Sequence, residues 1–197
     1  MTVPTTRPPE CGPLSTSRST AHLGFCICQS RSGDGRFAEF GLYEGYSINY
    51  FARNQQSAPT VIYGFDSSEG LKEDWAGHET AKGQFCLKGS LPVVESNVQL
   101  IKGRFDQKTL PAILAENAGP FGLSSILIRT PFEAAQTLFG LPPRLNHCGY
   151  DHYVRGMLWV HDWRLGEWIA WQEYMSPKSL LYEYLVFGPT HVAVRDL

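Results

Sequence analysis

The chain has 197 residues, of which 43% are hydrophobic and 18% are charged, and its formal net charge is −2. This composition is typical of one globular domain and excludes disordered and fibrous proteins. A general nucleic-acid binder needs a clustered excess of Lys and Arg, and 17 basic against 19 acidic residues do not supply one. We therefore expect no nucleic-acid partner, and small-molecule ligands stay open.

Cysteine usage and the lack of long apolar runs bear on the location of the protein. The five cysteines are odd in number and scattered, which disfavours a disulfide framework and favours a reducing compartment. Cys26 and Cys28 form a lone C-x-C without a second pair, so a zinc knuckle is not expected. Neither an apolar run of about 18 residues nor a signal pattern is present. We predict a cytoplasmic protein with no membrane partner.

Periodicity predicts where structure begins and which elements follow. Residues 1–20 are rich in Pro, Ser and Thr without periodicity, so we expect residues 1–35 to be a mobile tail and residues 36–197 to be the folded domain. Strand-like and helix-like segments then alternate, which predicts βαβ units and a parallel sheet with helices on both faces. The expected strands are 36–42, 60–66 and 97–103, the expected helices are 45–56, 110–117, 132–141 and 166–175, and 180–188 with 191–197 form an antiparallel hairpin at the sheet edge.

A glycine turn follows the first expected strand, where an open α/β sheet binds its ligand. Gly41 and Gly45 have the spacing G-x-x-x-G, whereas a dinucleotide site needs G-x-G-x-x-G. Glu39 and Glu44 flank the turn, and carboxylates close to a diphosphate would repel it. The ligand is expected to carry positive charge. The simpler interpretation is that the glycines only close a tight turn and that Glu39 is solvated.

An acid ends the second expected strand. Asp66 lies 25 residues after Gly41, and an acidic residue about 20 positions after such a turn is where a ribose diol is held. The two features together describe a nucleoside with a cationic group and no phosphates. S-adenosylmethionine, with its sulfonium and ammonium groups, fits this description.

Several separated motifs also carry a family resemblance in the right order. They are FAEFGLYEGYSINYFAR, VIYGFDSSEGLKEDW, KGQFCLKGSLP, VQLIKGRFDQKTLPAIL and GEWIAWQEY. In them, and over residues 36–197, the chain resembles class I S-adenosylmethionine-dependent methyltransferases of the macrocin O-methyltransferase type. The resemblance implies a Rossmann-like, doubly wound, seven-stranded and mostly parallel sheet with a C-terminal antiparallel hairpin. It also implies O-methylation of a hydroxyl on a small molecule such as a sugar or natural product.

The resemblance assigns cofactor-binding residues to three parts of the ligand. The methionine side would be held by Glu39, Gly41, Glu44, Gly45 and Ser47, the ribose by Asp66 with Ser67, and the adenine side by Arg104, Phe105 and Asp106. Asp106 has a second interpretation as a helix N-terminal acid favoured by the helix dipole. No catalytic residue is assigned.

The family pattern breaks where a metal would bind. Members carry acids after strands four and five that hold a divalent cation such as Mg²⁺. Here Arg129 stands where the first of these carboxylates is expected. The segment 146–162 is equally atypical, and its candidate metal ligands match no established spacing. These candidates are His147, Cys148, Asp151, His152, His161 and Asp162. Mg²⁺ is thus expected only in intact relatives.

Two compensated frameshifts would explain both departures. Permitted codons for Ser125–Pro131 can be read in a shifted frame as H-I-D-T-D-T, which restores the acids expected after strand four. Permitted codons for Gly149–Val160 can be read in the other shifted frame as G-M-I-I-T-F-E-E-C-F-G-Y, which resembles the fifth strand of the family and its acidic end. The expected result is a cofactor-binding homologue with impaired transfer, whose fifth strand contains residues 154–162. Ordinary divergence is the alternative for residues 123–131 and 146–162. A nucleotide-dependent dehydrogenase is a further alternative, which the absent third glycine disfavours.

Overall fold

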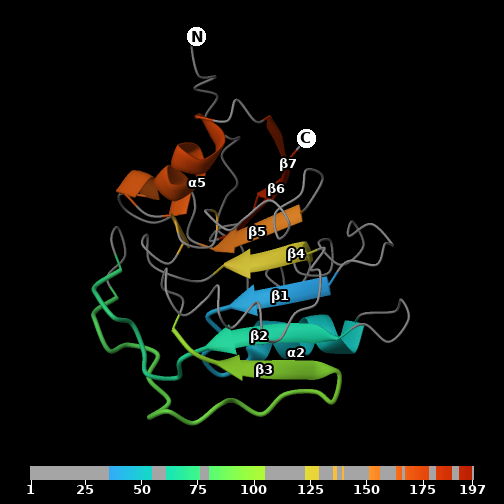
Figure 1. The fold of residues 1–197 in the computed structure, drawn as a ribbon, viewed down its shortest axis with the longest axis vertical. Coiled ribbons are helices and arrows are strands. Elements are labelled where there is room, and N and C mark those ends of the chain that lie inside the picture. The colour runs from blue at the N-terminus through green and yellow to red at the C-terminus, as the bar shows by residue number, and fades with distance from the viewer. Residues whose placement is uncertain are drawn as a thin grey trace.

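The fold is seen in a computed structural model, shown in Figure 1. It describes residues 36–54, 61–75, 80–104, 123–128, 135–136, 139, 151–155, 163–165, 167–177, 181–187 and 191–196. The expected tail 1–35 and the expected helix 110–117 lie outside these residues, as does most of the expected helix 132–141. No described helix is both long and apolar enough to cross a membrane.

One sheet organises the described part of the chain. Its strands are β1 (Arg36–Phe40), β2 (Ile62–Asp66), β3 (Val98–Lys102), β4 (Leu123–Ile128), β5 (Asp151–Arg155), β6 (Tyr182–Phe187) and β7 (His191–Asp196). They pair in the order β3-β2-β1-β4-β5-β7-β6 (Figure 1). Strands β1 to β5 run parallel, β7 runs antiparallel to β5, and β6 runs antiparallel to β7. The expected parallel sheet with a C-terminal antiparallel pair is confirmed. The order reverses between β1 and β4, and such a switch point opens a crevice beyond the strand ends.

The helices α2 (Tyr46–Asn54) and α5 (Glu167–Met175) lie where the apolar periodicity predicts them, and a short 3₁₀ turn, η1 (Trp163–Leu165), precedes α5. The inner face of α2 buries Ile48, Phe51 and Ala52 in one apolar cluster with β1 and β2. In α5, the buried ring of Trp171 contacts Tyr182 of β6 at a centroid distance of 5.5 Å. The helix α2 is therefore held by its apolar stripe, and α5 by the burial of Ala170, Trp171 and Met175.

The centre of the sheet is closely packed, because β1 and β2 are covered on both faces. The rings of Phe40 and Phe65 stack at 4.6 Å and are almost fully buried. Gly64 of β2 lies beneath α2, and a Cβ there would fall 2.7 Å from Ile48 Cδ1 and 2.9 Å from Leu100 Cδ2. A side chain at position 64 would therefore force the Ile48, Leu42 and Leu100 side chains to shift in a closely packed core.

The connection from β2 to β3, residues 67–97, is named here the β2–β3 insert. Where it is described, outside 76–79, it contains no helix, and two isolated bridges, Glu69 with Cys86 and Trp75 with Thr80, fold it back on itself. Its final part, 91–97, lies alongside α2, to which several polar side chains attach it. Asn49 Nδ2 donates to Val93 O and Asn49 Oδ1 accepts from Glu95 N, both at 2.9 Å, Asn97 Nδ2 donates to Ala52 O at 3.1 Å, and Arg53 pairs with Glu95.

The fifth strand differs from its expected position. β5 spans Asp151–Arg155 and shares only Val154 and Arg155 with the expected range 154–162. Its start is fixed by two neighbours, since Asp151 pairs with Ser125 of β4 and with Arg195 of β7. Pairing with strands distant in sequence, which local periodicity does not report, therefore sets this register.

Candidate cofactor-binding site

The turn between β1 and α2, residues 41–45, is named here the glycine turn. Gly41 and Gly45 have φ angles of 84° and 76°, in the left-handed region that a residue without Cβ enters at little cost. Gly41 N donates to Phe65 O and Gly45 N donates to Leu42 O, both at 2.9 Å. These bonds close the turn against the end of β2, at the switch point of the sheet. The prediction of a tight glycine turn at this position is confirmed.

Asp66 anchors the glycine turn. Its Oδ2 accepts hydrogen bonds from Leu42 N at 2.6 Å and Tyr43 N at 3.0 Å, and its Oδ1 accepts one from Ser68 N at 2.5 Å. A carboxylate offers about four acceptor positions, so three backbone amides leave room for about one more donor. Asp66 therefore shapes the turn before any ligand arrives. Its expected ribose contact stays a prediction and would use the remaining position.

A buried acid lies under the same turn. Glu39, at 2% exposure, accepts a hydrogen bond at Oε1 from the hydroxyl of the fully buried Ser47 at the start of α2. This hydrogen bond joins two residues that the sequence predicts at the site, and both side chains are buried beneath the turn. Glu44 is exposed at the tip of the turn. With Asp66, three carboxylates surround one short turn, which favours a cationic ligand over an anionic one.

The predicted ribose and adenine residues lie at the neighbouring strand ends. Ser67 is half-buried, and its hydroxyl accepts from Glu69 N at 3.2 Å. Arg104, just after β3, donates to Glu69 Oε2 from Nε at 3.0 Å and from Nη2 at 2.5 Å. This ion pair fastens the end of β3 to the β2–β3 insert. The other two adenine-side residues, Phe105 and Asp106, lie outside the described residues.

Three residues at this site were not predicted from the sequence. Tyr43 N, like Leu42 N, donates a hydrogen bond to the Asp66 carboxylate. The carbonyl oxygen of Ser68 accepts hydrogen bonds from Leu87 N at 3.1 Å and from Gly89 N at 2.9 Å. Phe85 reaches the ring of Tyr43 from the insert. Ser68 could have been suspected because it adjoins Asp66, but no sequence pattern connects Phe85 with a residue 42 positions earlier.

The sequence after β4 has a cation at the position where an acid is expected to hold Mg²⁺. β4 ends at Ile128, so the next residue in the chain is the cation Arg129, which itself lies outside the described residues. Among the residues that are described, no group of three or more His, Cys, Asp or Glu side chains could hold a metal. Of the candidate ligands in 146–162, Asp151 and His152 belong to β5 and the others fall in undescribed segments. We therefore derive no chemical step through a metal.

Solved structures share this architecture. CalS11, a calicheamicin methyltransferase described also as a TDP-rhamnose 3'-O-methyltransferase, aligns over 91% of this chain and 79% of its own, with 18% identity and a TM-score of 0.75. An O-methyltransferase from Bacillus cereus in complex with SAH aligns over 93% and 81%, with 14% identity and a TM-score of 0.52. A protein named as a ribosomal RNA methyltransferase, from Plasmodium falciparum, aligns over 90% and 93%, with 11% identity and a TM-score of 0.56.

No protein-family model matches the chain, and no curated protein matches it at a significant level. At identities of 11% to 18%, the likeness to solved structures establishes the fold. This is the Rossmann-like fold of methyltransferases, and it agrees with the resemblance found in the sequence motifs.

Proposed function

We propose that this chain, which has the methyltransferase fold, is an S-adenosylmethionine-dependent O-methyltransferase acting on a hydroxyl of a small molecule such as a sugar or natural product. The observation that carries the proposal is the glycine turn anchored by Asp66 and underlain by Glu39, at the switch point of a parallel sheet. A cationic nucleoside is the ligand that suits this acidic turn.

The predicted residues keep their proposed roles within this function. The methionine side of the cofactor would be held by Glu39, Gly41, Glu44, Gly45 and Ser47, the ribose by Asp66 and Ser67, and the adenine side by Arg104, Phe105 and Asp106. The burial of Ser47 and Glu39 supports a positioning part for this pair beneath the turn. We also propose that residues 36–197 form one folded domain, built on a complete sheet of seven strands.

Proximity supplies most of the proposed chemistry. The methyl group would pass from the sulfonium of the cofactor to the acceptor oxygen, while the hydroxyl proton leaves to a base. The residues of this chain would hold the donor in one orientation beyond the strand ends, and orientation alone accounts for a large part of such a rate. No residue is proposed for this base.

A small acceptor is favoured over RNA. CalS11 is described as acting on TDP-rhamnose, whereas the Plasmodium falciparum protein is named for ribosomal RNA, so the fold does not decide the acceptor. The net charge of −2 supports the small acceptor, because RNA binding needs clustered basic residues.

We also propose a reducing, cytoplasmic location for the protein. The free and exposed thiol of Cys86 is consistent with it.

The second candidate is a homologue that binds the cofactor and transfers poorly. β4 ends at Ile128, and the next residue in the sequence is Arg129, where an acid is expected. The shifted frame would place the apolar run M-I-I-T-F at residues 150–154, which overlap β5 (Asp151–Arg155). This overlap supports the frameshift hypothesis, and sequencing the coding DNA tests it. Codons that cannot be re-read in this way would rule it out.

Calorimetry separates these functions. Titration of the purified protein with S-adenosylhomocysteine should give heat of binding, and titration with NAD should give none. Heat with NAD alone would support a dehydrogenase and overturn the proposal. Incubation with S-adenosylmethionine, Mg²⁺ and hydroxylated sugars then separates an active enzyme, which releases S-adenosylhomocysteine, from a homologue that only binds.

A further inference from the structure

Backbone strain is concentrated around the glycine turn. The described residues other than glycine with positive φ are Tyr43 (51°), Ser68 (58°), Phe85 (65°) and Lys88 (53°). All of them belong to the glycine turn or to the β2–β3 insert. A left-handed backbone is unfavourable for a residue with a large side chain, and it persists only where surrounding contacts determine it. Two of these residues, Tyr43 and Phe85, touch each other.

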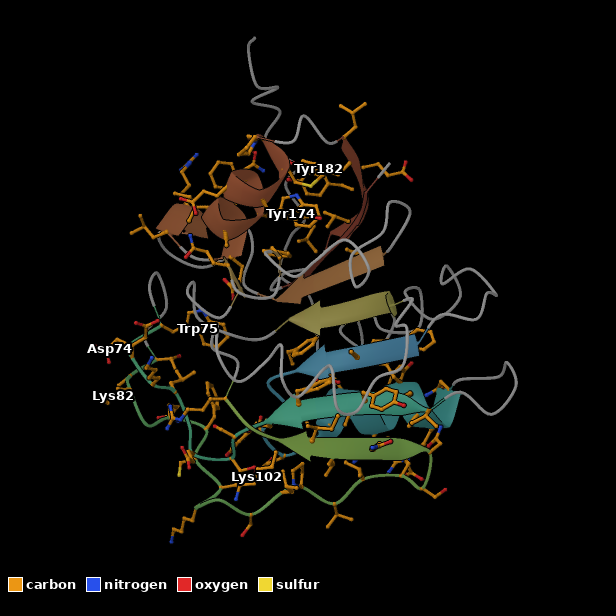
Figure 2. All side chains as sticks on the ribbon, in the orientation of Figure 1. Asp74, Trp75, Lys82, Lys102, Tyr174 and Tyr182 are labelled. Atoms are coloured by element: carbon orange, nitrogen blue, oxygen red, sulfur yellow. The ribbon has the colours of Figure 1, made fainter. Side chains whose placement is uncertain are left out.

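A chain of aromatic rings connects the insert to the turn. Trp75, at 7% exposure, meets Phe85 edge to face at a centroid distance of 6.3 Å, and Phe85 meets Tyr43 at 5.2 Å with an interplanar angle of 65°. Figure 2 shows Trp75 on the insert, on the side to which the strand arrows point. Phe85 therefore lies between a buried indole and the ring at the tip of the glycine turn.

The base of this aromatic chain is itself fixed. Trp75 N donates to Thr80 O at 2.9 Å, and Lys82 N donates to Asp74 Oδ1 at 2.8 Å, which closes the loop that carries Trp75 (Figure 2). On the other side of Phe85, Lys102 Nζ of β3 donates to Gly89 O at 2.6 Å. The insert is thus held on both sides of Phe85.

The insert also touches the other end of the glycine turn. A Cβ placed on Gly45 would lie 3.3 Å from Pro92 Cβ, so the turn and the insert are already in close approach there. Tyr43, meanwhile, is fixed at its amide by Asp66 and at its ring by Phe85. Among the described residues, the Tyr43 ring meets only the ring of Phe85, so removal of Phe85 would leave the tip of the turn without its aromatic contact.

We infer that Phe85 is a positioning residue for the cofactor. Its ring, set by a left-handed backbone and by Trp75, holds the Tyr43 ring and thereby keeps the glycine turn in its binding shape. The inference rests on the proposed function in one respect, namely that the glycine turn binds S-adenosylmethionine. The claim that Phe85 orders the turn is independent of the ligand.

Two variants and one control test the role in binding. Phe85→Ala should weaken S-adenosylhomocysteine binding about three- to tenfold, the equivalent of one lost aromatic pair. Phe85→Tyr keeps the ring and should bind like the wild type. Val93→Ala, a change at a side chain 90% exposed in the same insert, is the control and should also bind like the wild type. Affinity unchanged in Phe85→Ala, or lost equally in Phe85→Tyr, would overturn the inference.

Hydrogen exchange tests the ordering of the turn without ligand. The Tyr43 amide, which bonds to Asp66, should exchange faster in Phe85→Ala than in the wild type or Phe85→Tyr, while the Ala52 amide of α2 should not change. Equal Tyr43 exchange in all three proteins would refute the positioning role, whatever the cofactor does. Failure of the wild type to bind S-adenosylhomocysteine would instead refute the proposed function.

Discussion

At the scale of single residues, Asp66 combines a role in folding with a proposed role in binding. Its two oxygens accept from three backbone amides, two of them in the glycine turn and one at the start of the insert. Hydrogen bonds to a charged acceptor contribute more than neutral ones. The same side chain therefore has to be tested for stability and for affinity separately.

Asp66→Ala should lower the free energy of unfolding of the ligand-free protein by roughly 2 to 4 kcal/mol, because it leaves the Leu42, Tyr43 and Ser68 amides without their acceptor. Asp66→Asn keeps a carbonyl oxygen and should lose less. Urea denaturation measures both changes. An unaltered midpoint in Asp66→Ala would show that the turn does not depend on this anchor.

The same Asp66→Ala variant should lose roughly 1 to 3 kcal/mol of affinity for S-adenosylhomocysteine, because the charge-assisted bond to the ribose is removed. Calorimetry at a temperature where the variant is folded gives the affinity. If binding were as tight as in the wild type, the ribose would have to lie elsewhere.

The lack of room for a side chain at Gly64 leads to a prediction about stability. In Gly64→Ala, the new methyl group would meet Ile48 and Leu42 side chains within 2.8 Å, and overpacking of this kind costs about 1 to 3 kcal/mol of stability. Val61→Ala, at a side chain 42% exposed just before β2, is the matched control and should cost much less. Thermal unfolding of both variants checks the difference. Equal melting temperatures would mean that α2 can move away from the sheet.

At the scale of elements, the contacts that attach α2 to the insert should contribute unequally to the free energy of unfolding. Asn49→Ala removes the two hydrogen bonds to Val93 O and Glu95 N and should destabilise by about 1 to 3 kcal/mol. Arg53→Ala removes an ion pair whose side chains are 65% and 37% exposed, and should cost less than about 1 kcal/mol. Urea denaturation of the two variants ranks them. The reverse order would show that the ion pair, rather than Asn49, attaches the insert.

The burial of the Tyr184 phenol on β6 makes stability depend on pH in alkaline solution. Although 37% of Tyr184 is exposed, burial of its phenol raises its pKa above the ordinary value near 10, and the hydrogen bond with Tyr182 raises it further, while the bond with Trp168 opposes the shift. Below about pH 10 the phenol is neutral in both states, and its contribution to stability is complete. As the pH rises further, the unfolded chain loses this proton first, so stability falls.

Tyr184→Phe should therefore flatten the loss of stability above about pH 10. At neutral pH it should lose only the contribution of the hydrogen bonds with Tyr182 and Trp168. Urea midpoints of wild type and variant, measured on both sides of that pH, give the comparison. Parallel curves for the two proteins would contradict the assignment to Tyr184.

Elements with a clear period were predictable and the insert was not. The β2 segment is a near-continuous run of buried residues, and α2 has buried residues at helical spacing, so local pattern was enough for these two elements. The final part of the insert is attached to α2 by polar contacts between residues more than 40 positions apart, such as Asn49 with Glu95. At the site, the glycine turn and the acids could be predicted from residue type, but the bonds from Asp66 to backbone amides depend on the turn's shape. β5 was misplaced because its register comes from β4 and β7.

At the scale of the whole molecule, ligand binding should raise the melting temperature. A ligand that binds only the native state adds about 2.7 kcal/mol of stability at a concentration 100 times its dissociation constant. For a chain of 197 residues, this corresponds to an increase of roughly 5 to 11 °C. Differential scanning calorimetry with S-adenosylhomocysteine measures the shift, with NAD as control. An equal shift with both ligands would contradict the acidic, phosphate-excluding site.

Restoring the re-read segments tests the impaired alternative. A chain with H-I-D-T-D-T in place of Ser125–Pro131 and the re-read twelve residues in place of Gly149–Val160 should gain Mg²⁺-dependent methyl transfer, because it regains hard oxygen ligands. Its affinity for S-adenosylhomocysteine should match that of the original chain. Transfer by the original chain at the same rate would show that the two segments are ordinary divergence.

The hydrogen bonds that shape the glycine turn, and its aromatic contact with Phe85, are all made within residues 39–104. Changes after that run which preserve the pairing of β4 with β1 and the packing of β7 would leave these bonds in place. A library that keeps the strands and varies only the segments between them after β4 would accordingly sample new acceptors against a constant donor site, which makes this topology a convenient starting point for directed evolution.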